Sequence, residues 1–147
     1  MPRLHDSATR SAIKSRLQTL KPDARGRWGK MTVDQMMWHV NTGLEIALGR
    51  VKAAPAKAPL PRPILRFAVL NLPWPKGRAQ TFPEMVATGT YDFEAERKRC
   101  ARLLDEFAAK ELAGPWPDSP FLGPMSGGDH TRLQAKHVDH HLRQFGV

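Results

Sequence analysis

Prolines divide this sequence into segments, and the long segments between them carry apolar residues at helical spacing. Proline has no amide hydrogen to donate inside a helix, so no helix runs through Pro22 or through residues 55–63, 73–75 or 115–117. No segment shows the clean alternation of apolar and polar residues that marks a half-buried strand. The sequence therefore predicts an all-α fold, and its four main helical segments indicate a four-helix bundle.

The ends of these helices carry recognisable signals. The second helix has the clearest start, because Thr32 and Gln35 form a capping box in which each side chain bonds the other residue's amide. Gly49 marks the end of this helix, and Asp92 and Ser126 are the expected caps of the third and fourth helices. The expected helices cover residues 7–20, the stretch between Thr32 and Gly49, residues 92–112 and residues 126–145.

Residues 50–90 form a long proline-rich connection between the second and third helices. Its prolines prevent a continuous helix before Ile64, and we expect one short helix over Ile64–Leu72. A connection of this length in a compact domain usually packs across the body or serves the function. We interpret it as a crossover that joins two halves of the bundle.

The length of the chain indicates one domain, residues 1–147, and its cysteine content indicates a reducing compartment. A chain of 147 residues can bury a real core. The single cysteine, Cys100, excludes an internal disulfide and lies on the apolar side of the third helix, where we expect it to be buried. The first residues lack the apolar core of a signal peptide, and no apolar run has the length of a membrane span. We therefore expect a cytoplasmic protein without a membrane segment.

The net charge of +9 raises the question of a polyanionic partner. Nucleic-acid binding needs lysines and arginines gathered where they can meet phosphates. Here they occur singly or in small groups, each beside apolar or acidic residues. The pattern favours a solvated basic surface over a nucleic-acid interface.

Two histidines on the expected last helix have the spacing of metal ligands. His137 and His141 are four residues apart, which puts both rings on one helical face with their Cα atoms about 6 Å apart. Two imidazole nitrogens at this spacing can reach one metal ion. His140 and Asp139 lie on other faces, and we expect both to be surface residues. Exposed or packed histidines also occur at this spacing, so it leaves both interpretations open.

His39 borders the apolar stripe of the second helix, between Met36 and Val40. A histidine there faces the bundle, although a hydrogen-bonded core histidine fits the same position. Three neutral imidazoles and a water would give the open coordination of a catalytic zinc site. Imidazole suits nickel and iron as well, so the ligand type does not name the divalent metal.

Three stretches of the sequence resemble one branch of the DinB-like (YfiT-type) superfamily. They are residues 27–39, which begin RWGKMT, residues 90–97, TYDFEAER, and residues 136–146, KHVDHHLRQFG, the last of which matches the branch ending KHxDHHLRQFG. The resemblance implies a four-helix bundle with a long crossover between its second and third helices. It also implies a metal held by one histidine of the second helix and an HxxxH pair of the fourth. Those positions match His39, His137 and His141.

The resemblance further implies chemistry on a small-molecule substrate. Better-known members use the metal to activate a thiol or a water, and some transfer a low-molecular-weight thiol such as bacillithiol or mycothiol to an electrophile. A divalent metal lowers the pKa of a bound thiol or water and so creates a nucleophile at neutral pH. The predicted function is a metal-dependent thiol transferase or hydrolase. The sequence departs from the branch at Ser119, where relatives tend to have a histidine before the proline, and at His130, where an aromatic is common.

Two other functions fit the same sequence. One is a bundle that binds a small molecule, or serves a stress response, without turnover; the other is a basic nucleic-acid binder. A homodimer is compatible with a small bundle that carries four tryptophans. We expect these tryptophans to serve ordinary packing rather than to line a pocket; they are Trp28, Trp38, Trp74 and Trp116.

Overall fold

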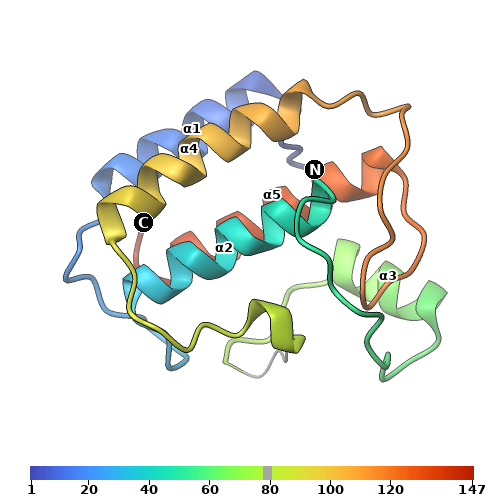
Figure 1. Ribbon diagram of the computed structural model, residues 1–147, viewed down its shortest axis with the longest axis horizontal. Helices are drawn as coiled ribbons and strands as arrows, with labels where there is room; N and C mark the ends of the chain where they lie inside the picture. The colour runs from blue at the N-terminus through green and yellow to red at the C-terminus, as the bar shows by residue number, and fades with distance from the viewer. Residues whose placement is uncertain (78–80) are drawn as a thin grey trace.

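The computed structural model describes residues 1–77 and 81–147 as helices joined by loops (Figure 1). In these two ranges no residue belongs to a β-strand, so the all-α fold expected from the sequence is confirmed. The helices are α1 (Ser7–Thr19), α2 (Val33–Ala47), α3 (Arg62–Asn71), the 3-10 helix η1 (Pro83–Met85), α4 (Phe93–Ala109) and α5 (Gly127–Gln144).

The long helices α1, α2, α4 and α5 form a bundle. α2 packs against α4 and α5, and α1 packs against the same two helices. α1 and α2 therefore lie on one diagonal of the bundle, and α4 and α5 lie on the other. In Figure 1, α4 lies above α2 in front, with α1 and α5 behind them. This order places α2 directly beside α5, and these two helices carry the three histidines of the predicted metal site.

The core fills the space between the four helices. It consists of the apolar faces that the helical spacing predicts, and burial of these faces is the main force that holds such a bundle together. Cys100 belongs to it, and burial raises the pKa of its thiol to about 12, so it is the inert core residue expected from the sequence. The largest fully buried side chains are Phe107, Leu4, Leu17, Leu20, Met36, Met37, Leu44, Leu103, Leu104 and Leu142.

The expected caps are present at three helix starts. The side chains of Asp92 and Ser126 each accept a hydrogen bond from the amide three residues later, at 3.0 and 3.1 Å. The capping box of Thr32 and Gln35 is present, with the Gln35 Oε1 atom accepting from the Thr32 amide at 3.1 Å. These bonds satisfy amides that a helix leaves without an intrahelical partner.

Two helix boundaries differ from the expectation. α4 ends at Ala109 because Lys110 has extended backbone angles and its amide donates to the Phe107 carbonyl. α3 begins at Arg62, because Pro63 occupies the first turn, where a missing amide hydrogen costs no intrahelical bond.

Residues 48–92 join α2 to α4 and bring two short helices onto the bundle. α3 packs against α5, and η1 packs against α2. The Lys136 ammonium of α5 donates to the Val69 and Leu72 carbonyls at 2.6 and 2.5 Å, at the C-terminal end of α3 where helical carbonyls lack partners. Residues of α2, α3, η1 and α5 together line one cavity.

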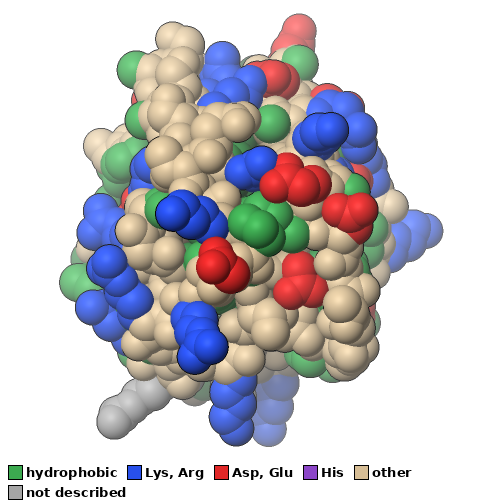
Figure 2. All heavy atoms as spheres, turned by 90° about the vertical axis from the view of Figure 1, so that its left-hand side faces the viewer, with side chains coloured by type: hydrophobic (Ala, Val, Ile, Leu, Met, Phe, Trp, Pro, Cys, Tyr) green, Lys and Arg blue, Asp and Glu red, His purple; other side chains and the backbone are tan. Residues whose placement is uncertain are grey.

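The surface mixes charges of both signs. On the face shown in Figure 2, acidic side chains lie among the lysines and arginines. Close ion pairs include Lys14 with Asp105 at 2.6 Å and Arg16 with Asp139 at 2.7 Å, so Asp139 lies on the surface as expected. Within the described ranges, none of the helices is both long enough and apolar enough to cross a membrane.

Candidate metal centre

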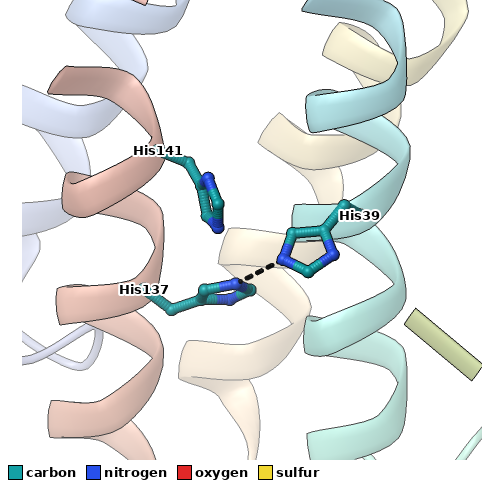
Figure 3. Close-up of side chains that lie close together, drawn as sticks. All are labelled: His39, His137 and His141. Atoms are coloured by element: carbon teal, nitrogen blue, oxygen red, sulfur yellow. Dashed lines mark hydrogen bonds between the residues drawn. The ribbon is translucent and has the colours of Figure 1, made fainter. Parts of the chain in front are cut away.

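Three histidines from two neighbouring helices converge on one point (Figure 3). His39 comes from α2, and His137 and His141 come from α5. One ring nitrogen of each lies within 4.8 Å of the others, and the Nε2 atoms of His39 and His137 are 3.0 Å apart. The three side chains are only 5%, 9% and 8% exposed. The structure therefore brings together all three histidines that the sequence singled out.

The His39 ring is oriented by a backbone carbonyl. Its Nδ1 atom lies 2.8 Å from the carbonyl oxygen of Met85, in η1. Because a carbonyl can only accept, Nδ1 carries the hydrogen and donates it. In a neutral imidazole the other nitrogen, Nε2, then presents its lone pair to the point where the rings converge.

A side chain orients His141 in the same way. Its Nδ1 donates to the Oε1 atom of Gln144 at 2.7 Å. The carboxamide cannot be reversed without loss, since its Nε2 donates to the Trp28 carbonyl at 2.8 Å. His141 therefore presents its Nε2 lone pair as well. A partner on the remote nitrogen of a metal-binding histidine commonly fixes the ring and raises its basicity.

His137 completes the set with a different local arrangement. Its Nε2 faces the unprotonated Nε2 of His39 at 3.0 Å, so one proton or one cation must lie between the two lone pairs. Gly43 of α2 leaves room for this ring. A Cβ at position 43 would lie 3.0 Å from the His137 Cε1 atom and 2.9 Å from the Met85 Cε atom.

The environment keeps all three rings neutral at ordinary pH. Burial lowers the pKa of His39, and burial together with the neighbouring His141 and His39 rings lowers the pKa of His137 far below its usual value. Burial and the His39 ring lower the pKa of His141 to about 3. A neutral imidazole is the form that binds metal. The chemistry of this donor set therefore fits one divalent cation of the zinc, nickel or iron type.

A cavity of about 680 Å³ lies beside the three rings, and all three line it. Three nitrogen ligands leave coordination positions open on a metal ion, so a molecule in this cavity would reach it directly. The volume is in the range of sites that bind small molecules and cofactors.

Two expectations about the surroundings of the histidines are wrong. His140 is half-buried and lines the cavity between Trp28 and Trp74, with ring centroids 5.5 and 5.4 Å away, instead of facing solvent alone. These two tryptophans line the cavity as well, rather than serving only as packing. The other two behave as expected, since Trp38 stacks on Tyr91 at 5.1 Å and Trp116 packs against the core.

Other cavity residues were not predicted from the sequence. Gln134 and His130 lie on the face of α5 that carries His137 and His141, at intervals of four, three and four residues along the helix. That spacing places the four side chains in one stripe along the helix, and this periodicity is the sequence signal that identifies Gln134 and His130 as neighbours of the histidine pair. The orienting contact from Met85 has no sequence signal, because η1 lies far from α2 along the chain.

Comparison with models of known families gives a match over most of the chain. Residues 6–145 match the model of the family described as the DinB superfamily. The matched range includes α1 to α5 and all three converging histidines. No curated protein and no solved structure gives a significant match to the chain.

Proposed function

The chain belongs to the DinB superfamily, and on that premise we propose that it is a metal-dependent enzyme whose metal ligands are His39, His137 and His141. The observation that carries the proposal is the orientation of the rings. Two of them are fixed by hydrogen bonds from Nδ1 so that their Nε2 lone pairs face one point, and the third completes the group within 4.8 Å.

The reaction that fits such a centre is thiol transfer or hydrolysis of a small molecule. A bound divalent metal supplies a lowered pKa for a thiol or a water, which makes either a nucleophile at neutral pH. The chain's own residues hold the three rings neutral, keep them nearly free of bulk water and provide the adjoining cavity. The thiol form of the proposal takes a low-molecular-weight thiol as one substrate.

Elemental analysis of untagged full-length protein tests the metal. We expect about one divalent metal ion per chain after reconstitution with zinc, nickel or ferrous iron and gel filtration. His39→Ala, His137→Ala and His141→Ala should each reduce this stoichiometry severely. His140→Ala is the matched control, because His140 lines the same cavity but does not belong to the group of converging ligand atoms.

Two results would overturn the proposal. One is a wild-type protein that stays metal-free after reconstitution. The other is an unchanged metal content in a folded His141→Ala protein, with folding checked by circular dichroism.

The cavity itself favours a second function, namely binding of a small molecule without turnover. Its volume of about 680 Å³ and its aromatic lining suit a ligand whether or not a metal is bound. Ligand binding that is identical in metal-loaded and metal-free protein, without turnover, would favour this alternative.

Three further features belong to the proposal. We take residues 1–147 as one domain of a cytoplasmic protein, and we take a homodimer as its assembled state. Light scattering on the eluted protein tests the dimer. Nucleic-acid binding is not part of the proposal, and the absence of DNA and RNA binding at low salt would agree with that.

A further inference from the structure

The cavity extends along α5 beyond the three histidines. His141, His137, Gln134 and His130 all line it and share one face of that helix. From His141 to His130 the helix rises by about 16 Å. A ligand held at the histidines therefore has room along the wall of α5 in the direction of His130.

The two ends of this cavity differ in chemistry. Near His141 lie Trp28, Trp74 and His140, and the Lys76 ammonium lies 5.0 Å from the centre of the Trp28 ring. The other end lies toward His130 and the Asp118 carboxylate, and its remaining lining is mainly apolar. We call it the inner chamber and define it by the lining residues Ile46, Ala47, Phe82, Phe121 and Leu122.

The walls of the inner chamber are fixed by packing. Ile46, Ala47 and Leu122 are 8%, 3% and 4% exposed. Phe82 and Phe121 meet edge to face, with ring centroids 5.4 Å apart. The chamber residues and the three histidines line one cavity, so the chamber is continuous with the histidine cluster.

Charged groups are nearly absent from the described cavity lining. Besides the histidines, only Lys30 and Asp118 carry a charge there. Among the described residues of the inner chamber, no lysine or arginine offsets the hydration that a carboxylate or phosphate would lose there. An alkyl chain or an aromatic ring would instead gain from leaving water.

We propose that the substrate of this site carries an apolar chain or ring that occupies the inner chamber while its reacting group lies at His39, His137 and His141. The inference rests on the proposed function, because the histidine cluster defines where the reacting group lies. It narrows the substrate class from small molecules in general to those with an alkyl or aryl portion attached to the reacting group. Among the described lining residues, Lys30 is the cation that a strongly anionic molecule would meet.

A series of metal-binding probes of increasing chain length tests the proposal. Acetohydroxamic acid and its straight-chain homologues up to octanohydroxamic acid are titrated calorimetrically into zinc-loaded full-length protein. We expect the affinity to rise about fourfold per added methylene until the chamber is full, and then to level off. A wild-type affinity that does not depend on chain length would overturn the proposal.

Two variants make the test specific to the chamber. Ile46→Trp fills it, so the long probes should fall to the affinity of acetohydroxamic acid, which itself should bind as in the wild type. Ile64→Trp makes the same substitution at a position of α3 that is 57% exposed, and it should leave the whole series unchanged. Long probes that bind folded Ile46→Trp as tightly as the wild type would contradict the chamber.

A third variant covers the case in which Ile46→Trp does not fold. Phe121→Ala enlarges the chamber and should move the levelling of affinity to longer probes, whereas an unchanged levelling point would count against the proposal.

Metal-free protein separates this inference from the proposed function. If acetohydroxamic acid shows no zinc-dependent binding to the wild type, the metal function fails. The chamber is then tested by 1-hexanol, which should still bind the wild-type protein. Ile46→Trp should abolish this binding. If Ile46→Trp does not fold, Phe121→Ala should change the affinity for 1-hexanol. Absence of 1-hexanol binding to metal-free wild type would overturn the chamber independently.

Discussion

Gln144 sets the direction of the His141 ring, and this gives a prediction for a residue that does not belong to the ligand set. Its Oε1 accepts from His141 Nδ1 at 2.7 Å, while its Nε2 is anchored to the Trp28 carbonyl. Gln144→Leu removes the acceptor at similar volume. We expect about a 10- to 100-fold loss of zinc affinity, the usual effect of losing such a partner. Competition with a chromophoric chelator measures it.

Gln144→Glu is the matched control for that prediction. A carboxylate also accepts from His141 Nδ1 but cannot donate to the Trp28 carbonyl, so this variant should bind zinc more tightly than Gln144→Leu and more weakly than the wild type. Wild-type affinity in Gln144→Leu would show that the hydrogen bond does not position the ring.

The neutral state of the histidines predicts a stability that depends on pH in metal-free protein. The pKa of His141 falls to about 3 in the folded chain from an ordinary value of 6.5. Between these pH values the unfolded chain binds a proton that the folded chain does not. The free energy of unfolding therefore has its full value above pH 6.5 and decreases as the pH falls toward 3. Urea denaturation at pH 7 and pH 5 should show this loss.

His141→Gln tests whether His141 causes that loss. The variant lacks the titrating ring, so its free energy of unfolding should change less between pH 7 and pH 5 than that of the wild type. An equal change in both proteins would assign the effect to other groups.

At the residue scale the sequence predicts the histidines better than their surroundings. The four-residue spacing of His137 and His141 is a property of one helix, so it could be recognised without a structure. The apolar setting of His39 and the family resemblance together indicate it as the third candidate ligand. His140 was misassigned because Trp28 and Trp74 come from loops that approach α5, and no periodicity within a helix predicts the path of a loop.

At the scale of elements, alanine substitutions at two adjacent glycines at the start of α5 should have opposite effects on the stability of the protein. A Cβ at Gly127 would overlap the Leu112 carbonyl and the Trp116 indole nitrogen, whereas a Cβ at Gly128 has only the Ser126 Oγ nearby, at 3.6 Å. Gly127→Ala should destabilise the protein by about 2–4 kcal/mol, within the range of severe overpacking. Gly128→Ala should stabilise it by about 0.5 kcal/mol through helix propensity and reduced chain entropy.

Urea denaturation of the two variants side by side checks this pair. Similar effects of both substitutions would contradict the close packing at Gly127. The two glycines differ because a Cβ at Gly127 meets backbone and indole atoms, whereas one at Gly128 meets only the Ser126 Oγ atom.

Element positions were predicted well and element ends less well. Periodicity and caps located α2 and α5, because Thr32 and Ser126 act within a few residues of the helix they begin. The end of α4 at Ala109 was placed too late, since Leu112 continues an apolar pattern although the backbone has already become extended at Lys110. Backbone angles at a helix end depend on the loop that follows, and that dependence is not local.

At the scale of the whole molecule, the residues of the candidate metal centre come from two helices, α2 and α5, so a metal bound there would stabilise their packing. A ligand that binds only the folded chain raises the free energy of unfolding by about 4 kcal/mol when its free concentration is 1,000 times its dissociation constant. For a domain of this size, zinc should therefore raise the melting temperature by on the order of 10 °C. Thermal denaturation followed by circular dichroism, with zinc and with a chelator, measures the shift.

The matched variants for this prediction are His39→Ala and His140→Ala. The first should abolish the shift caused by zinc, and the second should keep it. A shift that survives in His39→Ala would place the stabilising metal elsewhere.

The contact between His39 and His137 joins residues 98 positions apart in the chain. An unfolded chain rarely brings two such distant positions together, because closing a long loop costs conformational entropy. The three nitrogens therefore do not meet before α5 has docked on α2, and contacts of this range form slowly. A metal ion that needs all three nitrogens would therefore bind only after α5 has docked, and a chain interrupted before α5 would hold only one of the three candidate ligands.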